Sequence, residues 1–184
     1  AYLNTLDKKA VERFVEVTHE RYKEVVGDEF DETVPAIFTD EPQFTRKTLM
    51  DNSTDTDDLI MPWTDDFAKT YLNTYSQDIM EFLPEIFWDL PDGKVSTARY
   101  RYHDHIAERF SSAFADTVGG WCRENGIALT GHMMDEPTLE SQTGALGEAM
   151  RSYRSFGLPG IDMLCSWKEY TTAKQAQSAA HQFG

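Results

Sequence analysis

Cysteine is scarce in this chain, which excludes several kinds of site. The 184 residues include two cysteines, Cys122 and Cys165. Neither belongs to a Cys-x-x-Cys pair, so a cysteine zinc site and a dithiol redox motif have no support, and we expect two buried free thiols. No glycine-rich phosphate loop follows any apolar run. This absence weighs against a nucleotide-binding doubly wound fold.

Long apolar runs and positive charge are also lacking. No apolar run approaches the roughly 18 residues needed to cross a bilayer, and the first residues lack the basic-then-apolar form of a secretory signal. The formal net charge is −15, from 32 acidic and 17 basic residues, and such a surface repels phosphate backbones and anionic lipids. We therefore expect neither nucleic acid nor a membrane as partner, whereas a neutral sugar is compatible with this charge. The compartment stays open, because a cytoplasmic and a secreted bacterial protein both fit.

The rest of the composition is typical of a soluble globular protein, with 40% apolar and 27% charged residues. The length suits a single domain over residues 1–184. Short apolar runs that predict buried strands occupy residues 34–39, 127–134 and 161–165. Apolar residues recur with helical spacing over residues 4–26, 67–82, 96–124, 145–156 and 171–183. This alternation predicts an α/β fold in which parallel strands are covered by long helices.

Acidic side chains follow the first two predicted strands. Asp40 and Glu41 come directly after the first strand, Asp135 and Glu136 come directly after the second, and each pair precedes a proline. In α/β folds, catalytic groups collect beyond the carboxyl ends of the strands. Neighbouring strands lie about 4.8 Å apart. If these two strands are neighbours, Glu41 and Glu136 face one shared pocket.

A pair of carboxylates in one pocket matches the chemistry of glycosidic cleavage. One carboxylic acid is protonated and donates to the leaving oxygen, while the other is ionised and attacks the sugar or activates a water molecule. We therefore predict Glu41 and Glu136 as the catalytic pair. An Asp-Glu pair after a strand is also a common helix N-cap, which is the competing interpretation of Asp135 and Glu136.

Further polar and aromatic residues near the strand ends are predicted to bind the substrate. Polar groups hydrogen-bond a sugar and aromatic rings stack on its faces. For His132 the alternative is a satisfied core histidine, and for Asp162 it is a structural hydrogen bond. The predicted substrate-binding residues are Asp40, Trp63, His132, Asp135, Asp162 and Trp167, with Phe44 as a further aromatic candidate.

Two motifs suggest metal ligands, but their spacing argues against this interpretation. The run His103-Asp104-His105 falls in a predicted helix, where the two histidines point to different sides, and this favours surface histidines. The acidic stretch 51–58 lacks the central glycine and the closing glutamate of a calcium loop, which favours a flexible acidic loop. We therefore predict no metal ligands and no cofactor from the residues themselves.

Several segments together resemble the catalytic barrel of glycoside hydrolase family 106, the α-L-rhamnosidases and their relatives. The similarity extends over most of residues 34–167. It implies a (β/α)₈ (TIM) barrel, an oligosaccharide or glycoside substrate, and glutamates at strand ends as acid and base, which correspond to Glu41 and Glu136. It also implies calcium near the sugar, for which no clear ligand set stands out. The segments are Ile37–Pro42, Pro62–Thr64, Arg99–His103, Trp121-Cys122 with Gly126, Gly131-His132 with Glu136-Pro137, and Pro159–Asp162.

A second assignment of roles comes from the broader group of retaining barrel hydrolases. There the acid/base glutamate follows the fourth strand and the nucleophile follows the seventh. With strand 34–39 as the fourth, the nucleophile lies beyond Gly184 and Glu136 has a supporting role, while Glu41 keeps its role. Three strands cannot close an eight-stranded barrel. We therefore expect a partial TIM (β/α)₈ barrel, a fragment that is inactive alone and associates with the remaining barrel segments of its parent chain or with itself.

Two alternatives to a hydrolase stay open. The chain can be a non-catalytic module that binds a carbohydrate or a peptide on its acidic, aromatic-rich surface. It can also be a helical interaction protein in which the predicted strands are loops. A pocket shared by Glu41 and Glu136 favours the enzyme, and glutamates that point apart into solvent favour the binding module. Absence of parallel pairing between the three apolar runs favours the helical protein.

Overall fold

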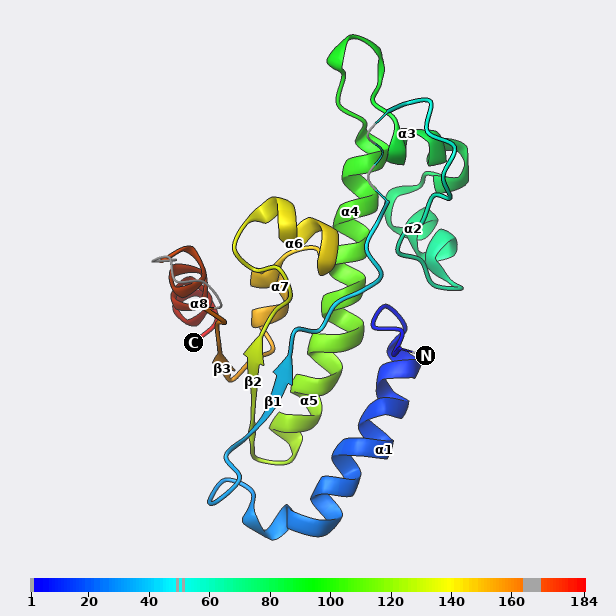
Figure 1. Ribbon diagram of the computed structural model, residues 1–184. Coiled ribbons are helices and arrows are strands. Elements are labelled where there is room, and N and C mark those ends of the chain that lie inside the picture. The colour runs from blue at the N-terminus through cyan, green and yellow to red at the C-terminus, as the bar shows by residue number, and fades with distance from the viewer. Residues whose placement is uncertain (1, 49, 51, 164–169) are drawn as a thin grey trace.

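The computed structural model describes residues 2–48, 50, 52–163 and 170–184, and Figure 1 shows a small sheet with helices packed behind it. The predicted α/β class is confirmed. The α-helices are α1 (Lys8–Val26), α2 (Phe67–Tyr75), α3 (Leu83–Phe87), α4 (Thr97–Phe110), α5 (Asp116–Glu124), α6 (Leu139–Ala145), α7 (Ala149–Tyr153) and α8 (Tyr170–Phe183). Single turns of other helix types are η1 (Gly27–Glu29), η2 (Ile79–Phe82), η3 (Pro91–Gly93) and the π-helical η4 (Ser111–Ala115).

The sheet consists of β1 (Ala36–Asp40), β2 (Ala128–His132) and β3 (Leu158–Pro159), in that order and all parallel. The register pairs Ala36 with Ala128 at one end and Asp40 with His132 at the other. The carboxyl ends of β1 and β2 therefore meet at the same edge, as the sequence predicted. Because the strands pair, the alternative of a helical protein with loops in their place is wrong.

The third strand lies earlier in the chain than predicted. It pairs Leu158 and Pro159 with Thr130 and Gly131 of β2, whereas the prediction placed it at residues 161–165. Pro159 has no N–H to donate, so pairing is brief, and the last contact is the bond from the backbone N of Gly160 to the carbonyl O of Gly131 (2.8 Å). Asp162 consequently follows the strand instead of lying within it, and Cys165 lies outside the described residues.

Two glycines allow the strands to approach closely near the edge where β1 and β2 end. Gly131 has φ +131°, and a Cβ atom there would lie 1.9 Å from the carbonyl O of Thr39. A Cβ on Gly160 would lie 2.7 Å from the carbonyl O of Gly131. Any side chain at Gly131 would thus both strain the backbone and push β1 away.

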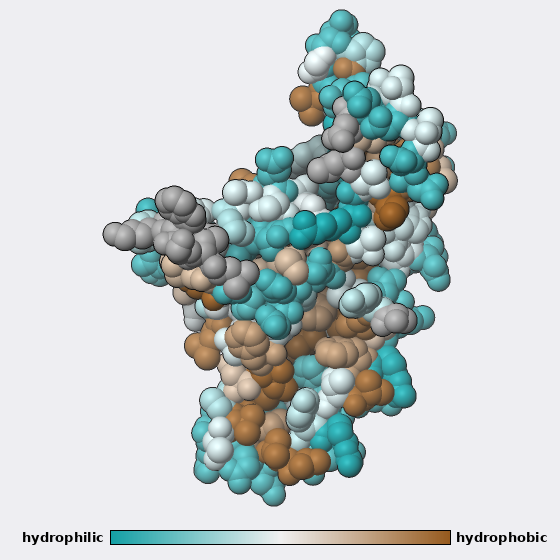
Figure 2. All heavy atoms as spheres, in the orientation of Figure 1, coloured by the Kyte–Doolittle hydropathy of each residue, from teal (hydrophilic) through white to brown (hydrophobic). Residues whose placement is uncertain are grey.

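Helices cover one face of the sheet, and no helix in the described part of the chain covers the other, bare face. Leu129 of β2 belongs to the core and Ile37 of β1 packs against it, on the side where α5 and α1 lie against each other. On the opposite face, Phe38 is 61% exposed, and Leu158 is also exposed. Figure 2 shows hydrophobic residues gathered over the region where Figure 1 draws the strands.

Two of the predicted helices are shorter or interrupted in the structure, and a third is continuous. The predicted helix 67–82 ends at Tyr75 because Ser76 adopts a left-handed conformation (φ 51°). The predicted helix 96–124 is confirmed as a continuous rod, with a π-helical turn between α4 and α5. The predicted helix 145–156 is too long: α6 ends at Ala145, and the helix within this range, α7, covers only Ala149–Tyr153.

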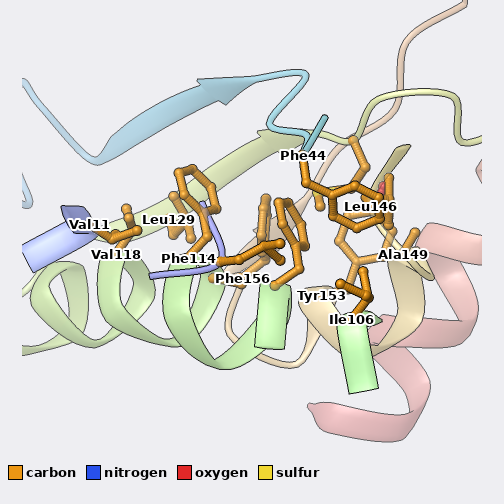
Figure 3. Packing of buried hydrophobic residues seen from close by; sticks show 14 of the residues in the cluster. Val11, Phe44, Ile106, Phe114, Val118, Leu129, Leu146, Ala149, Tyr153 and Phe156 are labelled. Carbon is orange, nitrogen blue, oxygen red and sulfur yellow. The ribbon is translucent and has the colours of Figure 1, made fainter. Parts of the chain in front are cut away.

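The core lies between the sheet, the α4–α5 rod and α1, and Figure 3 shows its centre. Phe114 and Val118 of the rod face Leu129 of β2, with Val11 of α1 beside them. Cys122 is a buried free thiol, as predicted, and burial raises its pKa to about 11. In the parts of the chain that the structure describes, no helix is both long and apolar enough to cross a membrane.

Candidate functional site

The candidate site begins where β1 and β2 end. Asp40 and His132 are register partners, and the Nε2 atom of His132 lies 3.0 Å from Oδ1 of Asp40. The His132 side chain is only 9% exposed, whereas that of Asp40 is 77% exposed. His132 is thus not a fully satisfied core histidine, because its Nδ1 atom is buried and has no hydrogen-bond partner among the described residues.

Glu41 follows β1 directly and adopts a left-handed backbone conformation, with φ 46°. This conformation is unfavourable for a residue with a Cβ, and such strain is frequent at functional sites. The segment after it is fixed, because the backbone N of Phe44 donates to the carbonyl O of Ala145 (2.9 Å). The half-buried Glu41 side chain is therefore held on a strained turn between the sheet and α6.

The structure brings Glu41, His132 and Asp162 together. Each offers one oxygen or nitrogen atom, and these atoms all lie within 4.8 Å of one another. They come from three separate segments: the turn after β1, the end of β2 and the loop after β3. The sequence predicted each residue near a strand end but paired Glu41 with Glu136, not with Asp162.

Glu136 contacts one member of this group, Asp162, and is only 3% exposed. Its Oε1 atom accepts a hydrogen bond from the backbone N of Asp162 (2.7 Å), and its Oε2 atom accepts one from the hydroxyl of Tyr153 (2.9 Å). The Tyr153 hydroxyl also lies 2.9 Å from the carbonyl O of Gly160. Burial and the neighbouring Glu136 carboxylate raise the pKa of Tyr153 well above its ordinary value. Glu136 thus ties the second Asp-Glu-Pro turn to the loop that carries Asp162.

Glu136 does not act as a helix N-cap. The N-cap of α6 is Thr138, whose hydroxyl accepts from the backbone N of Ser141 (3.1 Å). Asp135 forms an ion pair with Arg46, so both predicted N-cap residues are engaged in tertiary contacts. The N-cap interpretation of Asp135 and Glu136 is therefore wrong.

A pocket of about 930 Å³ opens beside Glu41, within the range of about 300–1,000 Å³ that is usual for small-molecule sites. The half-buried Trp63 lies on the wall of this pocket, and its ring centroid is 4.5 Å from the ring centroid of Phe67. The loop that carries Trp63 is anchored by a bond from the Tyr102 hydroxyl to the carbonyl O of Pro62 (2.8 Å). The lining residues include Tyr2, Asp40, Glu41, Phe44, Arg46 and Trp63.

The predicted residues therefore divide into four groups. Asp135 and Glu136 form the tertiary contacts described above. Asp40, Glu41 and Trp63 line the pocket, as does the further candidate Phe44. His132 and Asp162 lie close to Glu41, and Trp167 lies outside the described residues. The sequence reasoning missed Tyr153 and Arg46. A buried tyrosine hydroxyl needs a partner, and this was the available signal for Tyr153.

His103 and His105 are not the surface histidines that the sequence favoured. His105 is buried, with Nε2 2.9 Å from the hydroxyl of Thr70, and His103 is half-buried. Burial, reinforced by neighbouring cations, lowers the pKa of each to about 4. They are neutral at pH 7 and belong to the packing of α4, not to the candidate site.

Comparison with known proteins reveals no relative of this chain. No family model, no curated protein and no solved structure matches the chain.

Proposed function

We propose that this chain forms part of the active site of a (β/α)₈-barrel glycoside hydrolase, with Glu41 as the proton donor. The observation that carries the proposal is the position of Glu41, on a strained turn at the carboxyl end of a parallel strand and on the wall of a large pocket. Catalytic groups of α/β barrels occupy this position. Trp63 on the same pocket wall offers an aromatic face for a sugar ring.

The second carboxylate in this proposal is Asp162. One oxygen of Glu41 and one of Asp162 lie no more than 4.8 Å apart, which is short of the roughly 6.5–9.5 Å between the carboxyl groups of inverting enzymes and therefore favours a retaining pair. The proton of Glu41 passes to the glycosidic oxygen as the bond from the sugar carbon to that oxygen breaks. An oxygen of Asp162 bonds to the sugar carbon, and water, giving up its proton to Glu41, then displaces it.

Glu136 is a positioning residue in this proposal. Both of its oxygens are engaged by Tyr153 and by the backbone of Asp162, and its side chain is buried. It therefore has no free oxygen for a sugar, and its effect on the reaction passes through Asp162. The alternative in which the nucleophile lies beyond Gly184 keeps the same role for Glu136.

The bare face of the sheet supports a partial barrel. Parallel sheets are normally covered on both faces, yet Phe38 and Leu158 are exposed on the face opposite the helices. In a closed barrel this face would line the interior and pack against the remaining strands. The chain alone is then expected to be inactive, and its partners are the remaining barrel segments.

The test is a kinetic comparison in the protein that carries this chain together with the rest of the barrel. Glu41→Gln should lower kcat/KM on a panel of glycosides by about 10²-fold or more, since general acids contribute about 10²–10⁴-fold. Glu140→Gln, an exposed change on α6, is the control and should leave the rate unchanged. A loss of less than about tenfold for Glu41→Gln would remove Glu41 from this role, as set by the same range.

A further inference from the structure

The group formed by Glu41, His132 and Asp162 has the composition of a metal site. Two carboxylates and one imidazole present donor atoms within 4.8 Å of one another, and imidazole nitrogen and carboxylate oxygen are both ligands of divalent transition metals. The residues belong to three segments far apart in the sequence. Their convergence is therefore produced by the fold and not by local sequence spacing.

The state of the His132 ring is an independent observation that points to a ligand. Its Nε2 atom lies 3.0 Å from Asp40, while its Nδ1 atom is buried without a hydrogen-bond partner in the described part of the chain. A buried polar atom without a partner is unfavourable and calls for an explanation. Metal-bound histidines divide their nitrogens in this way, with one on the metal and the other hydrogen-bonded to a carboxylate or a carbonyl.

The ligands rest on backbone that is already fixed. Glu136 accepts from the backbone N of Asp162, and the close approach at Gly131 and Gly160 sets the spacing of the three segments. This bond leaves the Asp162 carboxylate free, because Glu136 binds only the backbone N–H of Asp162. A site of this kind loses little conformational freedom when an ion binds.

Calcium, the ion that the resemblance implies, does not fit this donor set. Calcium takes six to eight oxygen ligands, whereas this group offers two carboxylates and an imidazole nitrogen. Imidazole suits zinc and other first-row transition metals. We propose that Glu41, His132 and Asp162 bind a divalent transition-metal ion, represented in the test by Zn²⁺, in preference to Ca²⁺.

This inference does not require the proposed hydrolase activity. A glutamate bound to a cation cannot carry the proton that a general acid donates, so metal binding and proton donation are alternative states of Glu41. Binding of the ion by the chain and hydrolysis by the complete barrel are separate measurements. If the chain binds no ion, the hydrolase proposal still stands or falls on the kinetic test, and the reverse also holds.

The experiment is isothermal titration of the chelator-treated chain with ZnCl₂ and, separately, with CaCl₂ at pH 7. We expect one Zn²⁺ per chain, bound at least about tenfold more tightly than Ca²⁺, and a loss of at least about tenfold in Zn²⁺ affinity in His132→Gln. His181→Gln, an exposed change on α8, is the matched control for zinc held by surface histidines. The Zn²⁺ affinity of this control variant should equal that of the unchanged chain.

Circular dichroism monitors folding of each variant. If His132→Gln does not fold, Asp162→Asn replaces it, because this change keeps the backbone N–H that Glu136 binds, and it should show the same tenfold loss. Three results overturn the proposal: no Zn²⁺ binding, Ca²⁺ binding as tight as Zn²⁺ binding, or equal Zn²⁺ affinity in the unchanged chain and in the folded site variant.

Discussion

The Oε1 atom of Glu136 accepts a hydrogen bond of 2.7 Å from the backbone N–H of Asp162. This bond joins the turn after β2 to the loop after β3. It fixes the place of Asp162 relative to Glu41 without using the Asp162 carboxylate. The architecture of the candidate site therefore depends on a buried glutamate that has no free oxygen for a ligand.

Removal of this glutamate should destabilise the fold. In Glu136→Ala, the backbone N–H of Asp162 loses its acceptor and the Tyr153 hydroxyl keeps only the carbonyl O of Gly160, and we expect a loss of about 2–4 kcal/mol in the free energy of unfolding. Glu136→Gln keeps a carbonyl oxygen for Asp162 and should lose less than half as much. Urea denaturation at pH 7 measures both. A change in Glu136→Ala of under about 0.5 kcal/mol, typical of surface substitutions, would contradict the structural role of this carboxylate.

The contact between β1 and β2 at Gly131 leads to a second prediction. Gly131→Ala combines an unfavourable φ with a clash against the carbonyl O of Thr39, so it should cost about 3 kcal/mol or more or prevent folding. Gly144→Ala is the matched control. It lies in α6 with no heavy atom within 4 Å of an added Cβ, and it should stabilise the fold by about 0.4–1 kcal/mol. Thermal denaturation followed by circular dichroism distinguishes the two, and equal effects would mean that the close strand contact is absent.

The buried histidine of α4, His105, predicts a pH dependence of stability. Burial first, and then the Arg109 charge, lowers the pKa of His105 to about 4, below the ordinary value of about 6.5 in an unfolded chain. Between these two values the unfolded chain binds more protons, so stability falls as the pH drops from about 6.5 to about 4. Urea midpoints at pH 7 and pH 5 measure this loss.

His105→Gln is the variant for this prediction, because its amide can replace the bond to Thr70. The difference between the urea midpoints at pH 7 and pH 5 should be smaller in this variant than in the unchanged chain. His181→Gln, on the exposed surface, should keep the full difference. If His105→Gln also keeps it, His105 is not the group that titrates.

Trp63 should contribute to substrate binding and not to the chemical step. Loss of its ring in Trp63→Ala should raise KM by about tenfold with little change in kcat, the pattern of an interaction made equally in the ground state and the transition state. Trp63→Phe keeps an aromatic face and should recover much of the affinity. A fall in kcat at unchanged KM would show that Trp63 does not stack on the bound sugar.

The sequence predicted β1 and β2 correctly because their apolar runs are short and end in polar turns. It misplaced β3, since Leu158-Pro159 carries a weak strand signal and the apolar run 161–165 carries a strong one. It paired Glu41 with Glu136, whereas the structure groups Glu41 with His132 and Asp162. The distinction between Glu136 and Asp162 depends on the Tyr153 contact, which joins residues 17 apart through folding and leaves no mark in local spacing.

The measurement that tests the role of Glu41 most directly compares leaving groups in the complete barrel. Dinitrophenyl glycosides leave without protonation, whereas the matching methyl glycosides require a proton donor. We predict that Glu41→Gln loses about 10²-fold or more in kcat/KM on the methyl glycosides but less than about tenfold on the dinitrophenyl glycosides. Equal losses on both substrates, or no loss on either, would contradict the assignment of Glu41 as the general acid.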